Sequence, residues 1–399
     1  MTSSSARRPL SPPYDLPPLP VPDTRTVLYW VLFRDFDPTL PTPPVLALAE
    51  AAPTLAAHRL AAVALRLLQE LGVTLPSEAT AQLRAGAFLW GQRTATALTL
   101  GRAALDTLPK TSVPFVVTKG LGIALHHRSL AERPFSDVDI VVPKACYHKT
   151  LRHFESSGYS EREESKPPWR LLVTSCREAV NLESPAGGRL DVHHRIPPWI
   201  WGDRVTFAKL QQHSRAHRDG PFSGHPLAAT VDNFIISTLH IISDRNRPGE
   251  SVMIWRDILF LLENLTDTEI LEASLNYRLL PWVRWILSAL PPNTVRTSLT
   301  FTLSAARGSL PHPRRTALLL ASPSRRNVIL NQTLRLPTWR AALFLIAMLL
   351  PGPAFLRARF PNSHRRYRLW WLQGWDTLTT NPLSPSPTSP TRSVHGDSH

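Results

Sequence analysis

The chain has 399 residues, 43% of them hydrophobic and 19% charged, which describes a folded protein and excludes a largely disordered one. The formal net charge of +15 could attract polyanions such as nucleotides or RNA, although richness in arginine and alanine can equally reflect genomic base composition. The cysteines, Cys146 and Cys176, have no paired spacing, so neither a disulfide framework nor a zinc site is indicated. Reduced thiols in the cytoplasm fit this composition best.

No segment has the character of a membrane anchor. The amino terminus lacks the apolar stretch of a signal peptide. The apolar run at 341–356 is interrupted by Pro351 and Pro353 after about ten residues, whereas a spanning helix needs roughly twenty. We therefore expect no membrane span, and a buried helix at this position.

Composition and apolar patterning divide the chain into five parts. Proline and serine are abundant in residues 1–44, so we expect a mostly flexible lead. Apolar residues at helical spacing predict a helical support over 45–110. Alternating strand and helix patterns mark a core over 111–200, and a helical C-terminal domain follows over 201–375. The tail, 376–399, is rich in proline, serine and threonine and is expected to be disordered.

The core is predicted to alternate strands and helices and to end in a hairpin whose turn is 185–188. Strands are expected over 114–118, the Asp-x-Asp run from Asp137, 171–175, 179–182 and 189–193, and helices over 122–131 and 147–157. Later helices are expected over 227–243, 255–265 and 277–290, with mixed helix and loop over 310–337. The sequence thus predicts an α/β (mixed α+β) fold with a mixed sheet, N-terminal helices and an all-α C-terminal extension.

The most informative residues are two acids on one predicted strand. Asp137 and Asp139 occupy alternate positions of an apolar, β-branched run, so both carboxylates should leave the same face. Two carboxylates so close repel, and the pKa of one rises unless a cation neutralises them. The simplest solution is a divalent metal, Mg²⁺ or Mn²⁺, bound by oxygen ligands and substrate phosphates. Asp191 follows in another strand-like pattern and should meet the pair at one end of the sheet.

A glycine turn before a helix, then Asp-x-Asp, then a lone Asp on a later strand is the layout of a metal-dependent nucleotidyltransferase. In such an enzyme two metals activate the nucleophile and stabilise the departing pyrophosphate. We expect Asp137 and Asp139 to ligate both metals, with Asp139 in the bridging position. Asp191 would ligate the metal near the nucleophile and accept the proton of the attacking hydroxyl.

Five other residues are candidates for contacts with the nucleotide: Lys119, Gly120, Gly122, Arg133 and His193. The amides around the two glycines precede a predicted helix and could cradle phosphates. Lys119 and Arg133 could offset phosphate charge, and His193 should share a face with Asp191. Each has a structural alternative, because glycines can simply begin a helix and basic residues commonly lie on the surface.

Several short motifs are shared with a known family: Lys119-Gly120, Arg133-Pro134, Asp137-Val138-Asp139, Gly158-Tyr159 and Leu190-Asp191-Val192-His193-His194. They resemble the uncharacterised bacterial nucleotidyltransferase-like family of the polymerase-β nucleotidyltransferase superfamily, over roughly residues 45–375. The resemblance implies a polymerase-β-like palm with the three acids as its metal triad, and it places Lys119, Gly120 and Arg133 near the nucleotide. One departure is Gly120-Leu121, where the wider superfamily has Gly followed by Gly or Ser.

These observations favour an enzyme that uses Mg²⁺ or Mn²⁺ to move a nucleoside monophosphate from an NTP, such as ATP, to an acceptor hydroxyl. The acceptor would be a small molecule, a peptide or a protein. One alternative is a non-catalytic nucleotide-binding or scaffold protein with the same fold. Another is an RNA-directed or antitoxin-type nucleotidyltransferase, although no nucleic-acid-binding motif indicates it.

Overall fold

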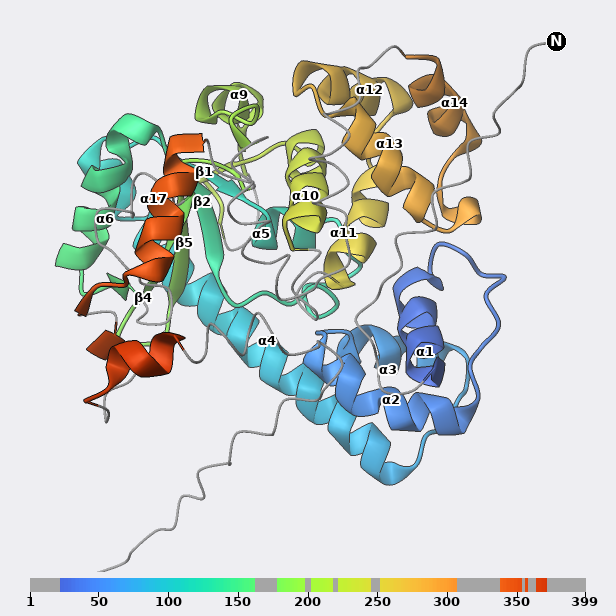
Figure 1. Ribbon diagram of the computed structural model, residues 1–399. Helices are drawn as coiled ribbons and strands as arrows, with labels where there is room; N and C mark the ends of the chain where they lie inside the picture. The colour runs from blue at the N-terminus through green and yellow to red at the C-terminus, as the bar shows by residue number, and fades with distance from the viewer. Residues whose placement is uncertain are drawn as a thin grey trace, which may run out of the picture.

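A computed structural model describes residues 22–161, 178–197, 202–217, 222–244, 252–306, 338–353, 356–357 and 364–371. This part of the chain has a mixed α+β fold in which many helices surround a seven-stranded mixed sheet (Figure 1). The fold class predicted from the sequence is confirmed. The predicted strand at 171–175, the segment 310–337 and the tail lie outside the described residues.

Four helices precede the sheet: α1 (Pro22–Phe33), α2 (Val45–Ala57), α3 (Ala61–Glu70) and α4 (Ser77–Leu105). Helix α1 corrects the expectation of a flexible lead, because it lies inside residues 1–44 and buries Leu28, Trp30 and Val31. These side chains belong to a large apolar cluster shared with α2, α3 and the helices after the sheet. The abundance of proline before this helix hides its apolar stripe in the sequence.

Helix α4 is 29 residues long and runs from the N-terminal helices to the sheet (Figure 1). Its contact with the sheet depends on glycine. A Cβ atom on Gly101 would lie 2.4 Å from Cγ2 of Val138, and one on Gly188 would lie 2.6 Å from Cβ of Leu100. Both glycines therefore allow helix and sheet backbones to approach closely.

The sheet has the strand order β3-β4-β5-β2-β1-β7-β6. Its strands are β1 (Val116–Thr118), β2 (Val138–Val141), β3 (Ser160–Glu161), β4 (Ala179–Glu183), β5 (Arg189–His193), β6 (Arg215–Ala216) and β7 (Pro226–Leu227). Strand β2 pairs in parallel with β5 and antiparallel with β1, and β4 and β5 form the predicted hairpin. The predictions for β1, β2, β4 and β5 are confirmed, whereas the two-residue strands β3, β6 and β7 were not predicted.

Alternation along the central strands separates an apolar face from a polar one. Val138 and Ile140 of β2 and Leu190 and Val192 of β5 are buried in one cluster with Phe154. Phe154 belongs to α6 (Tyr147–Ser156), which matches the helix predicted over 147–157. The alternate positions, which carry the acids, therefore point to the opposite face.

The helix predicted over 122–131 is shorter than expected. It is α5 (Gly120–Ala124), and the residues after it form a connection to β2. Short 3₁₀ turns lie at Leu108–Thr111, Lys144–Cys146 and Pro292–Thr294. Helix α9 (Phe207–His213) lies between β5 and β6, and β7 is followed by α10 (Thr230–Asp244), α11 (Val252–Glu263), α12 (Asp267–Asn276), α13 (Leu280–Ala289) and α14 (Thr297–Ala305).

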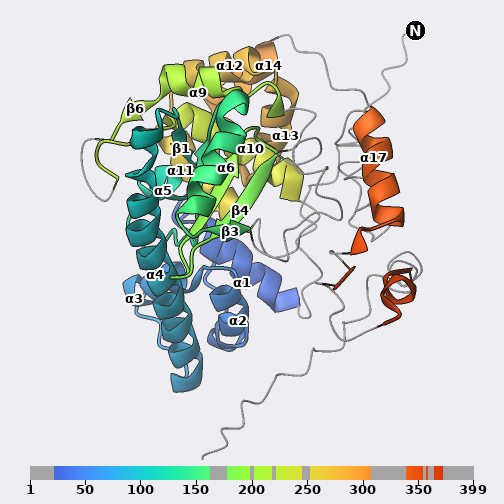
Figure 2. The same ribbon diagram turned by 90° about the vertical axis from the view of Figure 1, so that its left-hand side faces the viewer.

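Helix α17 (Thr338–Leu349) forms within the apolar run near the carboxyl end. Figure 2 shows it to one side of the sheet, apart from the helices that pack there. Ile346 is 54% exposed and Leu349 50% exposed, so the expectation of a buried helix was wrong for the residues that the structure describes. Among these residues, no helix combines the length and apolar character needed to cross a membrane.

Replacing Gly101 with alanine should destabilise the fold, because the added methyl group must displace the buried Val138 side chain. We expect the free energy of unfolding to fall by about 1–3 kcal/mol. Gly91→Ala on the same helix is the matched control, since nothing lies within 4 Å of its added Cβ and alanine favours the helix by about 0.5–1 kcal/mol. Urea unfolding of both variants checks this, and equal effects of the same sign would contradict the close packing.

Candidate metal and nucleotide site

Four polar residues form one row across the polar face of the sheet. The Cα partners are Thr118 with Asp139, Asp139 with Asp191, and Asp191 with Asn181. Residues paired in this way share a face, so the parallel pairing of β2 and β5 sets Asp139 directly beside Asp191. The prediction that acids from these two strands meet is confirmed for this pair.

The row leads to a cluster with the composition of a metal site. Ligand atoms of Asp139, Asp191 and His193 all lie within 4.8 Å of one another. Nε2 of His193 lies 2.9 Å from Oδ1 of Asp139, and both side chains are buried, while Asp191 is partly exposed. Two carboxylates and one imidazole fit a divalent cation such as Mn²⁺ or Mg²⁺.

Asp137 stands just outside this cluster, at the residue before β2. It is close enough to Asp139 for the two charges to interact. Burial raises the pKa of Asp137, and the charge of Asp139 raises it further, although Arg59, Lys119 and Arg133 oppose the shift. Burial is the larger cause of this rise in the pKa of Asp137, and repulsion by Asp139 is the smaller one.

The pKa of Asp139 shifts in the opposite direction. Burial alone would raise it, but the charge of Lys119 and the hydrogen bond from His193 together lower the pKa below its usual range. Nζ of Lys119 lies 2.9 Å from Oδ1 of Asp139. Burial and the charge of Lys119 lower the pKa of His193, which favours the neutral imidazole that can ligate a metal.

The backbone of Lys119 is held in an unusual conformation at the end of β1. Its φ is 49° and its ψ is −133°, which a residue with a side chain rarely adopts. Its N–H donates to Oδ1 of Asn233 at 3.0 Å, and Nδ2 of Asn233 donates to the carbonyl oxygen of Ala228. A Cβ on Gly122 would lie 2.9 Å from Nδ2 of Asn233. Asn233, on α10, thus fixes the turn that aims Lys119 at Asp139.

Sequence reasoning missed Asn233. The only signal was a polar residue beside the apolar stripe of the helix predicted over 227–243, and its partner lies 114 residues away.

Arg133, a predicted contact of the nucleotide, pairs with a buried carboxylate. Its Nε donates to Oδ1 of Asp257 at 2.6 Å, and its Nη1 donates to the carbonyl oxygen of Pro134. Nε2 of His127 lies 2.9 Å from the same oxygen of Asp257, which is fully buried on α11. Arg133 and His127 therefore fasten the connection between α5 and β2 to α11. The charge of Arg133 still reaches the site, because it lowers the pKa of Asp137.

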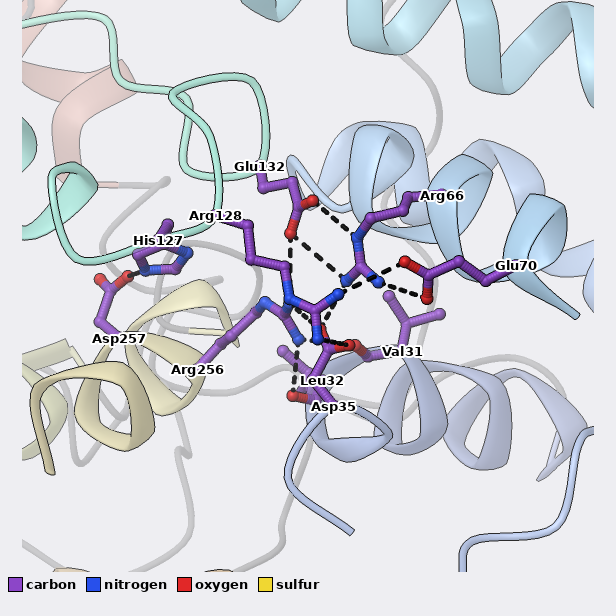
Figure 3. Close-up of polar contacts among 10 residues, drawn as sticks. All are labelled: Val31, Leu32, Asp35, Arg66, Glu70, His127, Arg128, Glu132, Arg256 and Asp257. Carbon is purple, nitrogen blue, oxygen red and sulfur yellow. Dashed lines mark hydrogen bonds and ion pairs between the residues drawn. The ribbon is translucent and has the colours of Figure 1, made fainter. Parts of the chain in front are cut away.

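A second group of charges secures the same connection (Figure 3). The guanidinium of Arg256, fully buried on α11, pairs with Asp35 and lies 3.4 Å from Glu132. Arg66 on α3 pairs with Asp35 at 2.5 Å and with Glu132 at 2.7 Å. Glu132 belongs to the segment that leads to Asp137, so this network joins the N-terminal helices, the approach to β2 and α11.

Arg256→Met should reduce the free energy of unfolding by about 3–5 kcal/mol, because it leaves Asp35 and Glu132 buried with fewer partners. Arg128→Met removes an arginine that also pairs with Asp35, at 3.3 Å, but whose side chain is 50% exposed. An exposed pair of this kind is worth about 0–1 kcal/mol. Chemical denaturation of the two variants measures the difference, and similar losses would show that burial of Arg256 is not decisive.

The stability contributed by Asp35 should depend on pH. Burial raises the pKa of Asp35, but the charges and hydrogen bonds of Arg256 and Arg66 outweigh it, so the pKa is lowered overall. A lowered pKa means that the contribution is complete above the unfolded value, near about 3.9, and is lost as the pH falls below it. Unfolding free energies of the wild type and Asp35→Asn should therefore converge between pH of about 5 and about 2. A gap independent of pH would contradict this assignment.

The comparisons with known proteins agree with the geometry. The sequence model of a family described as an uncharacterised nucleotidyltransferase matches residues 48–276, which include every candidate site residue. No curated protein matches the chain. Since the match covers more than half of its length, the chain belongs to this uncharacterised nucleotidyltransferase family.

Proposed function

We propose that the protein uses Mg²⁺ or Mn²⁺ to transfer a nucleoside monophosphate from an NTP to a hydroxyl-type acceptor on a small molecule, a peptide or a protein. The observation that carries this proposal is the convergence of Asp139, Asp191 and His193, whose ligand atoms lie within 4.8 Å of one another. Membership in the family supports the reaction class. We propose that residues 111–200 are the catalytic core and that the helices on both sides support it.

Asp137, Asp139 and Asp191 are the proposed metal ligands, with His193 as a further contact. The carboxylate oxygens and the imidazole nitrogen are donors of the kind that bind a divalent cation such as Mg²⁺ or Mn²⁺. A metal at this position would neutralise charge on the attacking and departing oxygens. Lys119 would move from Oδ1 of Asp139, or share it, when phosphates enter.

In the proposed reaction the acceptor oxygen forms a bond to the α-phosphorus while the bond from that phosphorus to the oxygen bridging to the β-phosphate breaks. Pyrophosphate leaves with the electron pair of the broken bond. Asp191, which is partly exposed, takes the proton of the acceptor hydroxyl. Lys119 offsets charge on the phosphates from beside Asp139.

Gly120 and Gly122 are proposed to bring backbone amides close to the phosphates. Gly122 is the tight position, since a Cβ there would lie 2.9 Å from Nδ2 of Asn233, whereas a Cβ on Gly120 would meet the carbonyl oxygen of Asp137 at 3.4 Å. Helix α5 has five residues, so its dipole contributes less than the predicted longer helix would. The individual amides, rather than the helix, carry this part of the proposal.

Asp139→Asn should abolish transfer of a labelled nucleotide while the protein remains folded. Incubation with Mg²⁺ or Mn²⁺, each labelled NTP and an extract or peptide mixture from the source cells, followed by mass spectrometry, measures the transfer. Asp106→Asn is the control, because that carboxylate is 54% exposed and pairs with His225 outside the site. Full activity of Asp139→Asn would refute the site assignment.

A non-catalytic nucleotide-binding protein is a second candidate, favoured by the 2.9 Å ion pair between Lys119 and Asp139, which already neutralises one carboxylate without a metal. Such a protein would bind NTP in calorimetry yet release no pyrophosphate with any acceptor. The enzyme should release pyrophosphate in proportion to labelled product, and EDTA should stop the release.

A further inference from the structure

Helix α17 exposes large apolar side chains along one face. They follow one another at spacings of four, three and four residues, which places them in a single stripe: Trp339, Leu343, Ile346 and Leu350. All four are exposed, Trp339 to 57% and Leu350 to 59%. The N–H of Leu350 donates to the carbonyl oxygen of Ile346 at 2.8 Å, so the stripe continues through the last turn. Contiguous apolar side chains of this size mark an interaction surface.

Buried residues fix the carboxyl end of this helix. Pro351 and Gly352, just after the stripe, are buried. Leu356 is also buried, and its N–H donates to the carbonyl oxygen of Gly352 at 3.1 Å. The exposed stripe therefore belongs to an anchored element.

A basic segment at 364–371 lies next to the end of α17. The hydroxyl of Tyr367 donates to the carbonyl oxygen of Pro351 at 3.0 Å, which joins the segment to the helix. Figure 2 shows the helical turn at 366–371 on the same outer side of the molecule as α17. The stripe and the basic segment thus form one surface.

The charge of this surface is positive. No Asp or Glu occurs in the sequence between Glu272 and Asp376, so α17 and the basic segment carry arginines without any acid. Arg357 and Arg368 are exposed. A partner that covers the stripe therefore meets cations at its edge, and negative charge on that partner is favoured.

These features together fit the surface of an anionic lipid bilayer. Its acyl chains accept apolar side chains, its phosphates pair with arginines, and Trp and Tyr side chains favour the boundary between the two. Trp339, Tyr367 and Trp371 are exposed aromatic residues of the stripe and the basic segment. RNA would pair with the arginines, but its phosphates offer no apolar contact to Leu343 and Ile346.

The length of α17 decides how it would lie on a bilayer. It has 12 residues, whereas a helix that crosses a bilayer needs roughly twenty. An interfacial helix instead lies along the surface, with its apolar face at the boundary between headgroups and acyl chains. Pro351 and Pro353, which interrupt the apolar run, exclude a span but not this arrangement.

We propose that α17 and the basic segment bind the surface of an anionic lipid bilayer. Leu343 and Ile346 enter the boundary layer, and Arg357 and Arg368 pair with lipid phosphates. The proposal is independent of the nucleotidyltransferase function, because it uses no residue of that site. It gives the helical C-terminal part of the chain a role in placing the protein at a membrane.

Co-sedimentation of the full chain with vesicles tests this proposal. Phosphatidylcholine vesicles that contain about one-third phosphatidylglycerol should bind the wild type about tenfold more tightly, or more, than vesicles of phosphatidylcholine alone. Two double variants, Leu343→Gln with Ile346→Gln and Arg357→Gln with Arg368→Gln, should each weaken binding to the anionic vesicles about tenfold or more. Added salt should weaken binding of the wild type more than binding of the arginine variant.

Arg84→Gln with Phe88→Gln is the matched control, because it removes an exposed arginine and a phenylalanine that is 67% exposed, both on α4. It should change the affinity for anionic vesicles less than about twofold. All the replaced side chains are exposed, so stability should change little, and urea unfolding shows that each variant is folded.

Equal binding to the two kinds of vesicle, or equal losses in the control and the α17 variant, would overturn the proposal. So would a wild type that binds a homopolymeric RNA but no vesicles, or one that light scattering shows to dimerise through the same stripe. Pyrophosphate release without vesicles should be the same in all these variants, so this test and the test of the proposed function succeed or fail separately.

Discussion

The repulsion among carboxylates on one face of the sheet is the constraint around which the site is organised. The register of β2 and β5 places Asp139 beside Asp191. Asp137, two residues before Asp139, is on the same side of the strand. Burial makes the negative charge of Asp139 costly. Lys119 and His193 both contact Oδ1 of Asp139 and stabilise its negative charge. The pKa of Asp137, in contrast, is raised. An arrangement that is only partly neutralised is suited to attract a divalent cation.

The placement of these acids depends on charges far from them in the sequence. Asp257 holds Arg133 and His127, and Arg256 holds Glu132 (Figure 3). Both anchors are consecutive residues of α11, and both fasten the connection that delivers Asp137 to the sheet. The helices after the sheet are thereby part of the support for the site. Networks of this kind specify one arrangement as much as they stabilise it.

Local patterns in the sequence were sufficient to predict the central strands and the acids that they carry. Strands β2 and β5 have alternating apolar residues, and α6 ends at a glycine with a φ of 87°, so both periodicity and a C-cap were visible. The strands β3, β6 and β7 could not be predicted, because each has only two residues and shows no alternation of apolar and polar side chains. Helix α1 was missed because proline precedes it, although Trp30 and its neighbours are buried.

The contacts that complete the site could not be predicted, because they join distant segments. Arg133 is predicted to contact the nucleotide, but its pairing with Asp257, which lies 124 residues away, left no local pattern in the sequence. The role of Asn233 at the turn of Lys119 depends in the same way on how α10 packs. Sequence thus indicated the acids, and tertiary structure supplied the groups that control their charge.

We propose that these acids hold a divalent cation at the polar face of the sheet. Electron paramagnetic resonance of Mn²⁺, titrated into the wild type and Asp191→Asn in the presence of an unreactive NTP analogue, tests it most directly. If the acids bind the cation, the wild type should give a bound-Mn²⁺ signal that is strongly reduced in Asp191→Asn. Equal Mn²⁺ binding by the two proteins would contradict it.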